Sequence, residues 1–313
     1  MSNLRVVFMG TPEFAVPCLE MLIQEQYDII AVVTQPDRPK GRGQKLVASP
    51  VKEFALKHGL QVLQPEKIKT IEFEDQLALL NPDVIIVVAF GQILSKRILD
   101  IPALGCINVH ASLLPKLRGA APIHWSIIEG ETITGVTTMY MDVGLDTGDM
   151  ILKSEVPISD NAITGEIHDQ LKLVGASVLK ETLMLIIQQA APRIPQNHQD
   201  ATYAPLLTKM IEKINWERSA VEIHNLIRGL NPWPGAYCCY QNRVLKIWRS
   251  RIHDADMATT RPGRVVKVTA EGILVETGLG VIEILEVQPE SKRRMLAKEC
   301  ACGYCINTGE IFG

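Results

Sequence analysis

Two apolar runs of strand length, separated by a stretch of helical pattern, begin this 313-residue chain. Residues 4–9 have the pattern of a buried strand that ends at Gly10, and Ile29–Thr34 has the pattern of the next strand. Pro12 suits the first turn of the helix between them, which we expect to continue to about Gln26. A strand–helix–strand unit of this length predicts parallel strands joined by a right-handed crossover.

Further apolar runs extend the predicted sheet. Residues 84–89 and Cys106–Val109 are continuously apolar, as expected for strands that are covered on both faces. Residues 136–141 predict another strand, and residues 164–190 carry apolar side chains at helical spacing. The predicted fold class is therefore α/β, with a Rossmann-like, mostly parallel sheet and helices on both of its faces.

The composition changes after the long helix. Residues 191–207 are rich in Pro, Gln and Asn and predict a linker. Beyond them, short β-patterned runs at even spacing predict a smaller barrel or sandwich. We expect a first domain over 1–190, a linker over 191–207 and a second domain over 208–313.

Nucleotide-binding fingerprints are missing from the first strand–helix turn. Gly10-Thr-Pro-Glu-Phe-Ala is not G-x-G-x-x-G, and no G-x-x-x-x-G-K-[ST] motif occurs in the chain. The sheet is therefore expected to serve as a scaffold with its ligand at the carboxyl ends of the strands.

The sequence also disfavours two classes of protein, those that span a membrane and those that a disulfide framework stabilises. No apolar run reaches the roughly 18–20 residues that a membrane span needs, and the first residues lack the pattern of a signal peptide. We expect a cytoplasmic protein without a membrane partner. Seven cysteines do not indicate a disulfide framework, and Cys302 with Cys305 lacks the second pair that a structural zinc site requires. No metal is expected.

Three polar side chains of different type converge on the predicted carboxyl edge. Asn108 and His110 are two residues apart, so on a strand they share one face, and Val109 points to the other. Asp146 follows in a loop that contains Gly144 and Gly148. An amide and an imidazole can stabilise an oxyanion, and a carboxylate can orient or charge the imidazole and assist proton transfer. These are the groups needed for acyl transfer to an amine by direct attack.

Each residue also has a structural interpretation. Asn108 could be a turn residue, His110 a hydrogen-bonded structural histidine and Asp146 the cap of a turn. The combination of the three favours the catalytic interpretation.

At these residues the chain resembles the folate-dependent formyltransferases. The pattern is Asn108-x-His110, the following Ser112-Leu-Leu-Pro115 and the later Asp146. Further segments resemble the branch that formylates methionyl-tRNA, and they span nearly the whole chain: Phe8–Ala15, Thr34–Gly43, Leu117–Ile123, Met141–Met150 and Asn231–Gly235.

The resemblance implies transfer of a formyl group from 10-formyltetrahydrofolate to the α-amine of methionyl-initiator tRNA. Asn108, His110 and Asp146 take the catalytic places of the family. The co-substrate would contact two segments, made of Ser112, Leu113, Leu114 and Pro115 and of Phe90, Gly91, Gln92 and Ile93. The first domain would be the catalytic domain, and the second would be an oligonucleotide-fold-type (OB-like) β-barrel that docks on tRNA.

Basic residues agree with an RNA partner. The net charge is −3, but residues 208–313 hold 15 Lys and Arg against 12 Asp and Glu. Residues 35–45 are rich in Pro and Gly and predict a loop between sheet and site. This basic loop can follow a phosphate backbone, although such loops are usually only solvated. The residues expected to contact tRNA are Arg38, Lys40, Arg42, Lys45, Arg243 and Lys246.

Two alternatives stay open from the sequence. The first is a formyltransferase for a small amine, such as glycinamide ribonucleotide or an aminosugar nucleotide, which would need neither the basic loop nor the basic second domain. The second is an RNA-binding protein on a formyltransferase scaffold without chemistry, which the intact Asn108, His110 and Asp146 disfavour. Nothing in the sequence requires obligate assembly, and we expect a monomer.

Overall fold

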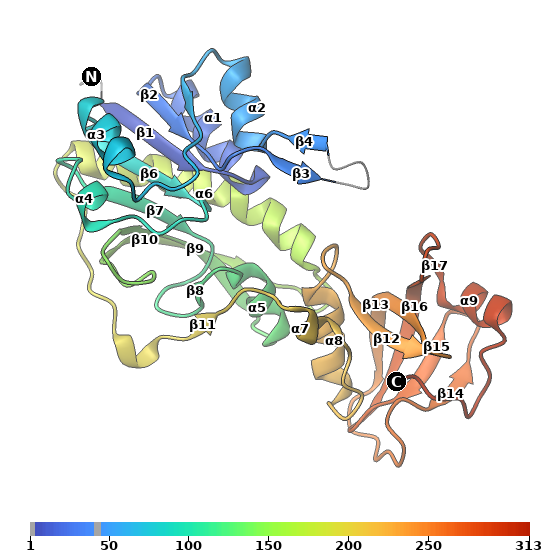
Figure 1. Ribbon diagram of the computed structural model, residues 1–313. Coiled ribbons are helices and arrows are strands. Elements are labelled where there is room, and N and C mark those ends of the chain that lie inside the picture. Colours follow the sequence, from blue (N-terminus) through green and yellow to red (C-terminus); the bar gives the residue numbers. More distant parts are fainter. Residues whose placement is uncertain (1–3, 41–44) are drawn as a thin grey trace. The chain divides into compact units, whose positions relative to one another are not determined.

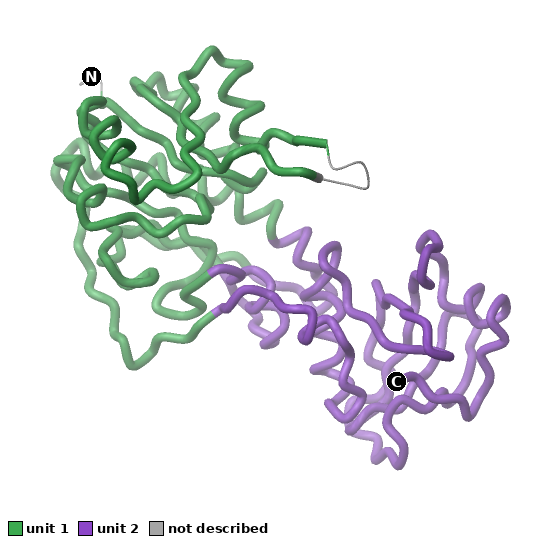
Figure 2. Tube along the Cα trace, viewed as in Figure 1, with its two compact units in different colours: residues 1–119, 135–156, 168–203 green, residues 120–134, 157–167, 204–313 purple. Residues whose placement is uncertain are grey.

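The structure, a computed structural model, describes residues 4–40 and 45–313 and divides into two compact units. Unit 1 comprises residues 1–119, 135–156 and 168–203, and unit 2 comprises residues 120–134, 157–167 and 204–313 (Figure 2). Each unit thus contains segments from distant parts of the sequence. The sequence-based boundaries at 190 and 208 stay a prediction, because compact units need not coincide with independently folding domains.

A seven-stranded sheet forms the centre of unit 1, in the order β10-β9-β7-β6-β1-β2-β5 (Figure 1). The pairings β1–β2, β1–β6, β2–β5 and β6–β7 are parallel, and β9 lies antiparallel to β7. The strands are β1 Arg5–Gly10, β2 Asp28–Val33, β5 Val62–Leu63, β6 Val84–Val88, β7 Cys106–His110, β9 Ile133–Tyr140 and β10 Met150–Pro157. The predicted mostly parallel, Rossmann-like sheet is confirmed.

Helices cover both faces of this sheet. One face carries a core that includes Val87, Cys106, Phe73 from α3 and Ile98 from α4. On the opposite face, α6 packs at Gly175, where an added Cβ would lie 3.3 Å from Val109 Cγ1. The helices that begin in unit 1 are η1 Glu13–Ala15, α1 Val16–Gln24, α2 Pro50–Lys57, α3 Ile71–Leu79 and α4 Lys96–Leu99, and α6 Thr164–Ile187 begins in unit 2 and ends in unit 1.

Side-chain caps explain where several of these helices begin. Ser49, Thr70 and Ser95 each accept a hydrogen bond from the backbone N–H three residues ahead, at the starts of α2, α3 and α4. Such caps satisfy amides that have no partner within the helix, and each typically contributes about 1 kcal/mol.

The segment 35–45, which we expected to be a loop, contains a short ribbon. β3 (Arg38–Lys40) pairs antiparallel with β4 (Lys45–Val47), and residues 41–44 lie outside the described part of the chain. The Pro and Gly content suggested a loop, but a two-stranded ribbon consists of edge strands, and an edge strand tolerates a proline such as Pro39.

Unit 2 is built on antiparallel strands, in the order β12-β13-β16-β15-β14, with β17 on β16. The predicted smaller β-barrel domain is confirmed as the fold class. The strands are β12 Ala236–Tyr240, β13 Arg243–Asp254, β14 Val265–Val268, β15 Ile273–Glu276, β16 Val281–Pro289 and β17 Met295–Leu296. The helices are α5 Pro122–Ile128, α7 Lys209–Glu212, α8 Ala220–Gly229 and α9 Ala297–Tyr304. Two further strands pair as a short ribbon: β8 Arg118–Gly119 belongs to unit 1, and the two residues of β11 Tyr203–Ala204 fall in different units. The short helix η2 His198–Asp200 of unit 1 precedes β11.

The last residues, for which the sequence suggested no role, complete the core of unit 2. Cys300, Ile306 and Phe312 are buried in the cluster formed by the strands and α8. Gly313 exchanges backbone hydrogen bonds with Cys239, so the tail is held against β12.

The seven cysteines are free thiols, and burial raises the pKa of the Cys300 thiol to about 11. Among the described residues, no helix is both long and apolar enough to cross a membrane.

Within unit 2, His224 of α8 connects two other segments. Its Nδ1 lies 3.0 Å from Ser250 Oγ on β13, and its Nε2 lies 3.2 Å from the Asp160 carbonyl oxygen. Burial lowers the pKa of His224 below its ordinary value of 6.5, because the charged ring loses hydration. The folded state therefore keeps the ring neutral to lower pH than the unfolded chain does.

This shift predicts a loss of stability on the acid side. As pH falls below about 6.5, the unfolded chain binds a proton that the folded state resists, and the loss levels off below the folded-state pKa. We expect the drop in unfolding free energy between about pH 7.5 and pH 5.5, measured by urea titration, to be smaller in His224→Gln. The same substitution at the exposed His253 is the control, and an equal drop in wild type and His224→Gln would contradict the assignment.

Candidate active site

The site is built on the carboxyl end of β7. In the parallel pairing with β6, Asn108 lies opposite Val87, a member of the core that α3 and α4 cover. Because strand side chains alternate, Asn108 and His110 share a face of the sheet and Val109 faces α6. Both polar side chains are buried, with 8% of Asn108 and 6% of His110 exposed. The predicted shared face of Asn108 and His110 is found in the structure.

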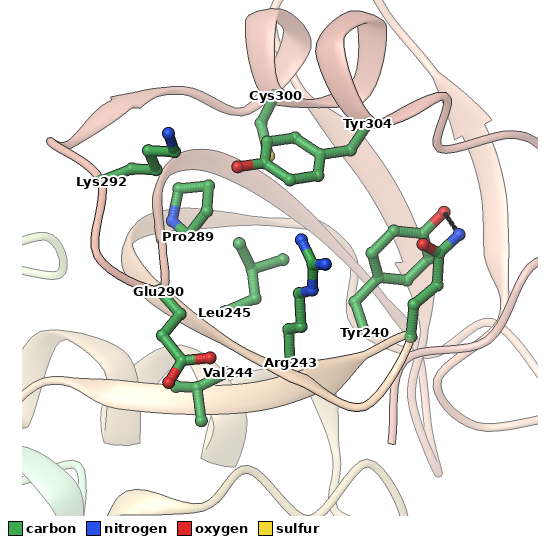
Figure 3. A pocket seen from close by; sticks show the side chains of 10 residues that line it. Tyr240, Arg243, Val244, Leu245, Pro289, Glu290, Lys292, Cys300 and Tyr304 are labelled. Carbon is green, nitrogen blue, oxygen red and sulfur yellow. Dashed lines mark hydrogen bonds between the residues drawn. The ribbon is translucent and has the colours of Figure 1, made fainter.

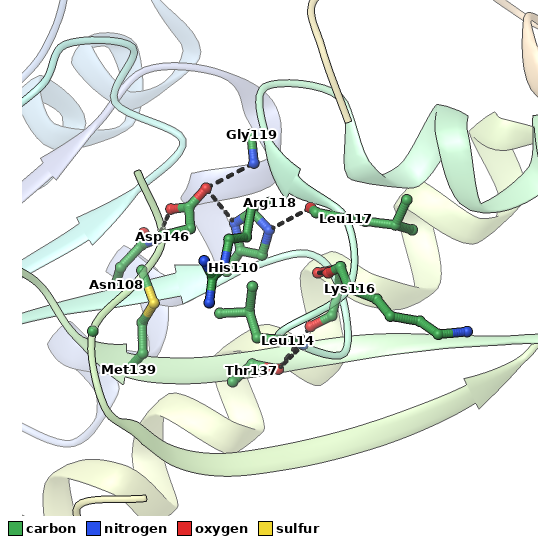
Figure 4. A network of polar contacts seen from close by, with 12 residues as sticks. Asn108, His110, Leu114, Lys116, Leu117, Arg118, Gly119, Thr137, Met139 and Asp146 are labelled. Carbon is green, nitrogen blue, oxygen red and sulfur yellow. Dashed lines mark hydrogen bonds and ion pairs between the residues drawn. The ribbon is translucent and has the colours of Figure 1, made fainter. Parts of the chain in front are cut away.

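Asp146 reaches these side chains from the loop between β9 and β10 (Figure 4). Its Oδ1 accepts a hydrogen bond from Asn108 Nδ2 at 3.4 Å, and its Oδ2 accepts one from the Gly119 backbone N–H at 2.8 Å. His110 Nδ1 lies 3.7 Å from Oδ2. The carboxylate thus accepts from an amide and a backbone donor and lies beside an imidazole, and only 13% of its side chain is exposed.

The contact of the second ring nitrogen of His110, Nε2, determines where the hydrogen of the neutral ring lies. Nε2 lies 3.0 Å from the Leu117 carbonyl oxygen, and a carbonyl only accepts, so Nε2 carries a hydrogen. Nδ1 is then the position at which the ring can gain or release a proton, directly beside the carboxylate. This arrangement can stabilise a developing oxyanion and move a proton at one site.

The loop that carries Asp146 is braced from within. Asp142 Oδ1 accepts hydrogen bonds from the Gly144 N–H at 2.9 Å and from Thr147 Oγ1 at 2.6 Å. Asp146 itself has a φ of 53°, in the left-handed region that few non-glycine residues occupy. At Gly148 an added Cβ would lie 1.8 Å from the Tyr140 carbonyl oxygen, so only glycine fits.

Two further residues contact this loop, and the sequence interpretation missed their roles. Gln196 follows α6 and donates to the carbonyl oxygens of Asp146 at 2.9 Å and Gly148 at 2.8 Å. Arg118 is almost fully buried and donates to Gln196 Oε1. The sequence signal for Arg118 was an arginine within the otherwise apolar segment 117–123. Gln196 gave no such signal, because it lies in a stretch whose composition indicates a linker.

The segment Ser112–Pro115 directly follows β7. Thr137 Oγ1 donates to the Ser112 carbonyl oxygen at 2.7 Å and accepts from the Leu114 N–H at 3.1 Å. Ser112 and Leu114 are fully buried, while Leu113 and Pro115 are partly exposed. Lys153 donates to the Leu114 carbonyl oxygen, and burial lowers the pKa of Lys153. The segment is held rigidly, with Leu113 and Pro115 left accessible.

The segment Phe90–Ile93 follows β6, the parallel neighbour of β7, so both segments begin at the same edge of the sheet. Phe90 is buried in the core, and its carbonyl oxygen accepts from Thr11 Oγ1 at 3.0 Å and Gln35 Nε2 at 3.2 Å. Gln92 Oε1 accepts from the Ile68 N–H. Gly91 is exposed, as is Ile93 at 61%.

The predicted basic residues are distributed over both units. In unit 1, Arg38 and Lys45 are exposed on the ribbon of β3 and β4, Lys40 lies on β3 opposite Lys45, and Arg42 lies outside the described residues. Arg38 forms an exposed ion pair with Glu66 at 3.9 Å. The ribbon begins beside Asp37, and hydrogen bonds from Gln64 and Lys52 hold the pKa of Asp37 below its ordinary value.

In unit 2, Arg243 and Lys246 both lie on β13 but three residues apart, so they point to opposite faces of the strand. Lys246 Nζ donates to the Pro234 carbonyl oxygen at 2.6 Å. Arg243 lines a pocket whose other walls include Tyr240, Lys292 and Tyr304 (Figure 3). The structure therefore does not bring these two predicted tRNA contacts together.

Among the residues that the structure describes, no group of three His, Cys, Asp or Glu could hold a metal ion.

Comparison with known protein families defines the class of this protein. The family described as formyl transferase matches residues 4–183, and the formyl transferase C-terminal domain matches residues 206–305. The chain therefore belongs to the formyl transferase family. The enzyme class predicted from its motifs is confirmed.

Comparison with curated proteins identifies the branch of the family that this chain resembles. The methionyl-tRNA formyltransferase of Acetivibrio thermocellus is 53% identical over 99% of this chain and 100% of that protein. That of Clostridioides difficile is 54% identical, with 99% of this chain and 100% of that protein covered. The resemblance to this branch, recognised from the motifs, is confirmed.

Solved structures share the fold at low sequence identity. The sugar 3N-formyl transferase WlaRD, crystallised in the presence of dTDP and 5-N-formyl-THF, has a TM-score of 0.68 and 21% identity, with 94% of this chain and 100% of that chain covered. The N-formyltransferase from Helicobacter canadensis, in complex with folinic acid and dTDP-3-aminofucose, has a TM-score of 0.67 and 21% identity, with 90% and 99% covered.

The contacts of the loop glycines predict unequal effects of adding a methyl group. Gly148→Ala would press against the backbone carbonyl of Tyr140, whereas Gly144→Ala would meet the side chain of Thr147, which can rotate. We expect Gly148→Ala to lower the rate of formyl transfer by about 100-fold, because it displaces Asp146, and Gly144→Ala to lower it much less. Steady-state turnover of both variants measures this, and equal effects would show that the loop adapts at either position.

Proposed function

We propose that this enzyme transfers the formyl group of 10-formyltetrahydrofolate to the α-amine of methionyl-initiator tRNA. The observation that carries the proposal is the more than 50% identity to methionyl-tRNA formyltransferases over essentially the full length of both proteins. The site geometry supports it, since the amide, imidazole and carboxylate needed for acyl transfer are joined at one edge of the sheet.

In the proposed reaction, the neutral amine attacks the formyl carbon and forms a C–N bond while the carbonyl electrons move to oxygen. We infer that Asn108 Nδ2, through the hydrogen that does not bind Asp146, and His110 Nδ1, when it carries a proton, donate to this oxyanion. Collapse of the intermediate breaks the bond to N10 of the folate. Asp146 takes the proton that the amine loses, and N10 gains one, so charge and atoms balance.

The folate co-substrate fits the two segments beside β7. Leu113 and Pro115 after β7 and Ile93 after β6 offer accessible apolar surface at the edge of the sheet where β7 carries Asn108 and His110. The flat part of a bicyclic tetrahydropterin ring requires such a surface together with a few fixed polar groups. We infer that Ser112–Pro115 and Phe90–Ile93 hold this ring, with Ser112, Leu114 and Phe90 acting through the buried contacts that fix the backbone.

We further infer that the ribbon of β3 and β4 contacts the tRNA. It exposes Arg38 and Lys45, and its residues 38–45 also include Lys40 and Arg42. The carboxylate of Asp37, held by Lys52 and Gln64, anchors the base of the ribbon to α2 and to the residue after β5. A basic ribbon with an anchored base can follow a phosphate backbone while its position relative to the sheet stays defined.

A choice among acceptors tests the proposed function. Formyl transfer is measured with 10-formyltetrahydrofolate and three acceptors in parallel: methionyl-initiator tRNA, free methionine and an aminosugar nucleotide. We expect turnover with the tRNA alone, lowered about 100- to 1,000-fold in Asp146→Asn and unchanged in Asp100→Asn, an exposed control. Preference for the aminosugar nucleotide would instead establish the small-amine alternative, and tRNA binding without any turnover would establish a protein that has lost its chemistry.

Arg42→Ala should weaken the use of tRNA without affecting folate. Loss of one phosphate contact reduces counterion release, so we expect a higher KM for tRNA and a slope of log(kcat/KM) against log[salt] that is shallower by about one. The KM for 10-formyltetrahydrofolate should stay constant. Lys57→Ala, which removes an exposed cation from α2, is the matched control, and unchanged tRNA kinetics in Arg42→Ala would contradict the contact.

A further inference from the structure

Gln196 makes a complete set of hydrogen bonds behind the active-site loop. Its side chain is buried, with 7% of the residue exposed. Nε2 donates to the carbonyl oxygens of Asp146 and Gly148, at 2.9 and 2.8 Å. Oε1 accepts from Arg118 Nε at 3.1 Å and Arg118 Nη2 at 2.6 Å. The two N–H donors and the two acceptor positions of the amide are thus used.

The orientation of this amide has one chemical solution. A guanidinium has no acceptor, so the atom that faces Arg118 must be the amide oxygen. Carbonyl oxygens have no donor, so the atom that faces Asp146 and Gly148 must be the amide nitrogen. Turning the amide over would place four groups against partners of the same polarity, and the network therefore holds Gln196 in a single orientation.

Both donated bonds end on the backbone that aims the catalytic carboxylate. Asp146 has a positive φ, which is a strained conformation for a residue with a side chain and persists where surrounding contacts hold it. Gln196 binds the carbonyl of Asp146 itself and that of Gly148, two residues on. The side chain of Asp146 is directed from this backbone toward Asn108, His110 and the Gly119 N–H.

Arg118 connects the Gln196 side chain to the backbone segment that contacts His110 and Asp146. Its guanidinium is buried and lies beside Gln196 Oε1 and His198 Nδ1, the latter at 3.3 Å. The residues on either side of it in the chain, Leu117 and Gly119, contact His110 and Asp146 through their backbone. The segment 117–119 therefore holds the imidazole and the carboxylate directly, and the backbone behind the carboxylate through Gln196.

We propose that Gln196 is a positioning residue for Asp146, held in its orientation by Arg118, and that it sets the rate of the chemical step without contacting substrate. This inference rests on the proposed role of Asp146 in formyl transfer. It assigns to residues 191–207 a function in catalysis, in place of the connecting role that their composition suggests.

Two substitutions separate positioning from stability. Gln196→Glu keeps the length of the side chain and its bonds to Arg118 but replaces the donors with oxygens that repel the Asp146 and Gly148 carbonyls. Gln196→Met keeps the approximate volume and removes both sets of bonds, so it also leaves Arg118 with fewer partners. Gln199→Met, three residues on at an exposed position, is the matched control.

We expect both Gln196 variants to lower kcat for methionyl-initiator tRNA by about 10- to 100-fold, with the KM values for tRNA and folate nearly unchanged, because displacement of a catalytic group by about 1 Å has effects of this size. Gln196→Glu should keep the melting temperature of the wild type. Gln199→Met should behave as the wild type. If Gln196→Glu is folded and retains full kcat, the proposal is wrong.

A double-mutant cycle decides whether the effect passes through Asp146. In single-turnover measurements, Gln196→Glu should change the rate of the Asp146→Asn enzyme by less than about twofold, because residues that act as one unit are not additive. An equal loss in both backgrounds would show that Gln196 acts elsewhere and would overturn the inference. If Asp146→Asn itself retained full turnover, the proposed role of Asp146 would fail instead, and the two failures are therefore distinguishable.

Discussion

The partly buried carboxylate of Asp146 is the group around which the site is organised. A charge removed from water is costly unless several donors replace its hydration. Here the donors are the Asn108 amide and the Gly119 N–H, with the His110 ring beside the same oxygen. Asn108 and His110 come from β7 and Gly119 from β8, so the carboxylate can be accommodated only when β7, β8 and the loop after β9 are all in place.

The parallel sheet makes this convergence possible. Strands β6 and β7 end at the same edge, and the buried core on both faces keeps that edge rigid. The segment 117–119 then contributes backbone groups to both His110 and Asp146, and Gln196 binds the loop from behind. Catalytic groups supported by elements of the scaffold and by a second layer of hydrogen bonds keep their geometry better than groups on an isolated loop.

Much of the fold follows from local patterns. Continuous apolar runs identified β1, β2, β6 and β7, and the period of two correctly placed Asn108 and His110 on one face. Composition was less informative where long-range contacts determine the local structure. Residues 38–40 and 45–47 pair as a ribbon although the sequence around them is rich in Pro and Gly, and the tail after Glu299 is needed to fill the core of unit 2. Arg243 and Lys246 are close in sequence, but strand alternation separates them.

The sequence by itself determined the class of fold, the strand that carries Asn108 and His110, and, through its motifs, the family to which the chain belongs. Only the tertiary structure decided how Asp146 is aimed and what holds it. The physical reason is that periodicity reports how a side chain is oriented within its own helix or strand, whereas a loop takes its conformation from distant partners. Gln196 lies 50 residues from Asp146 in the chain, and no local pattern connects a buried amide to the carbonyl that it fixes.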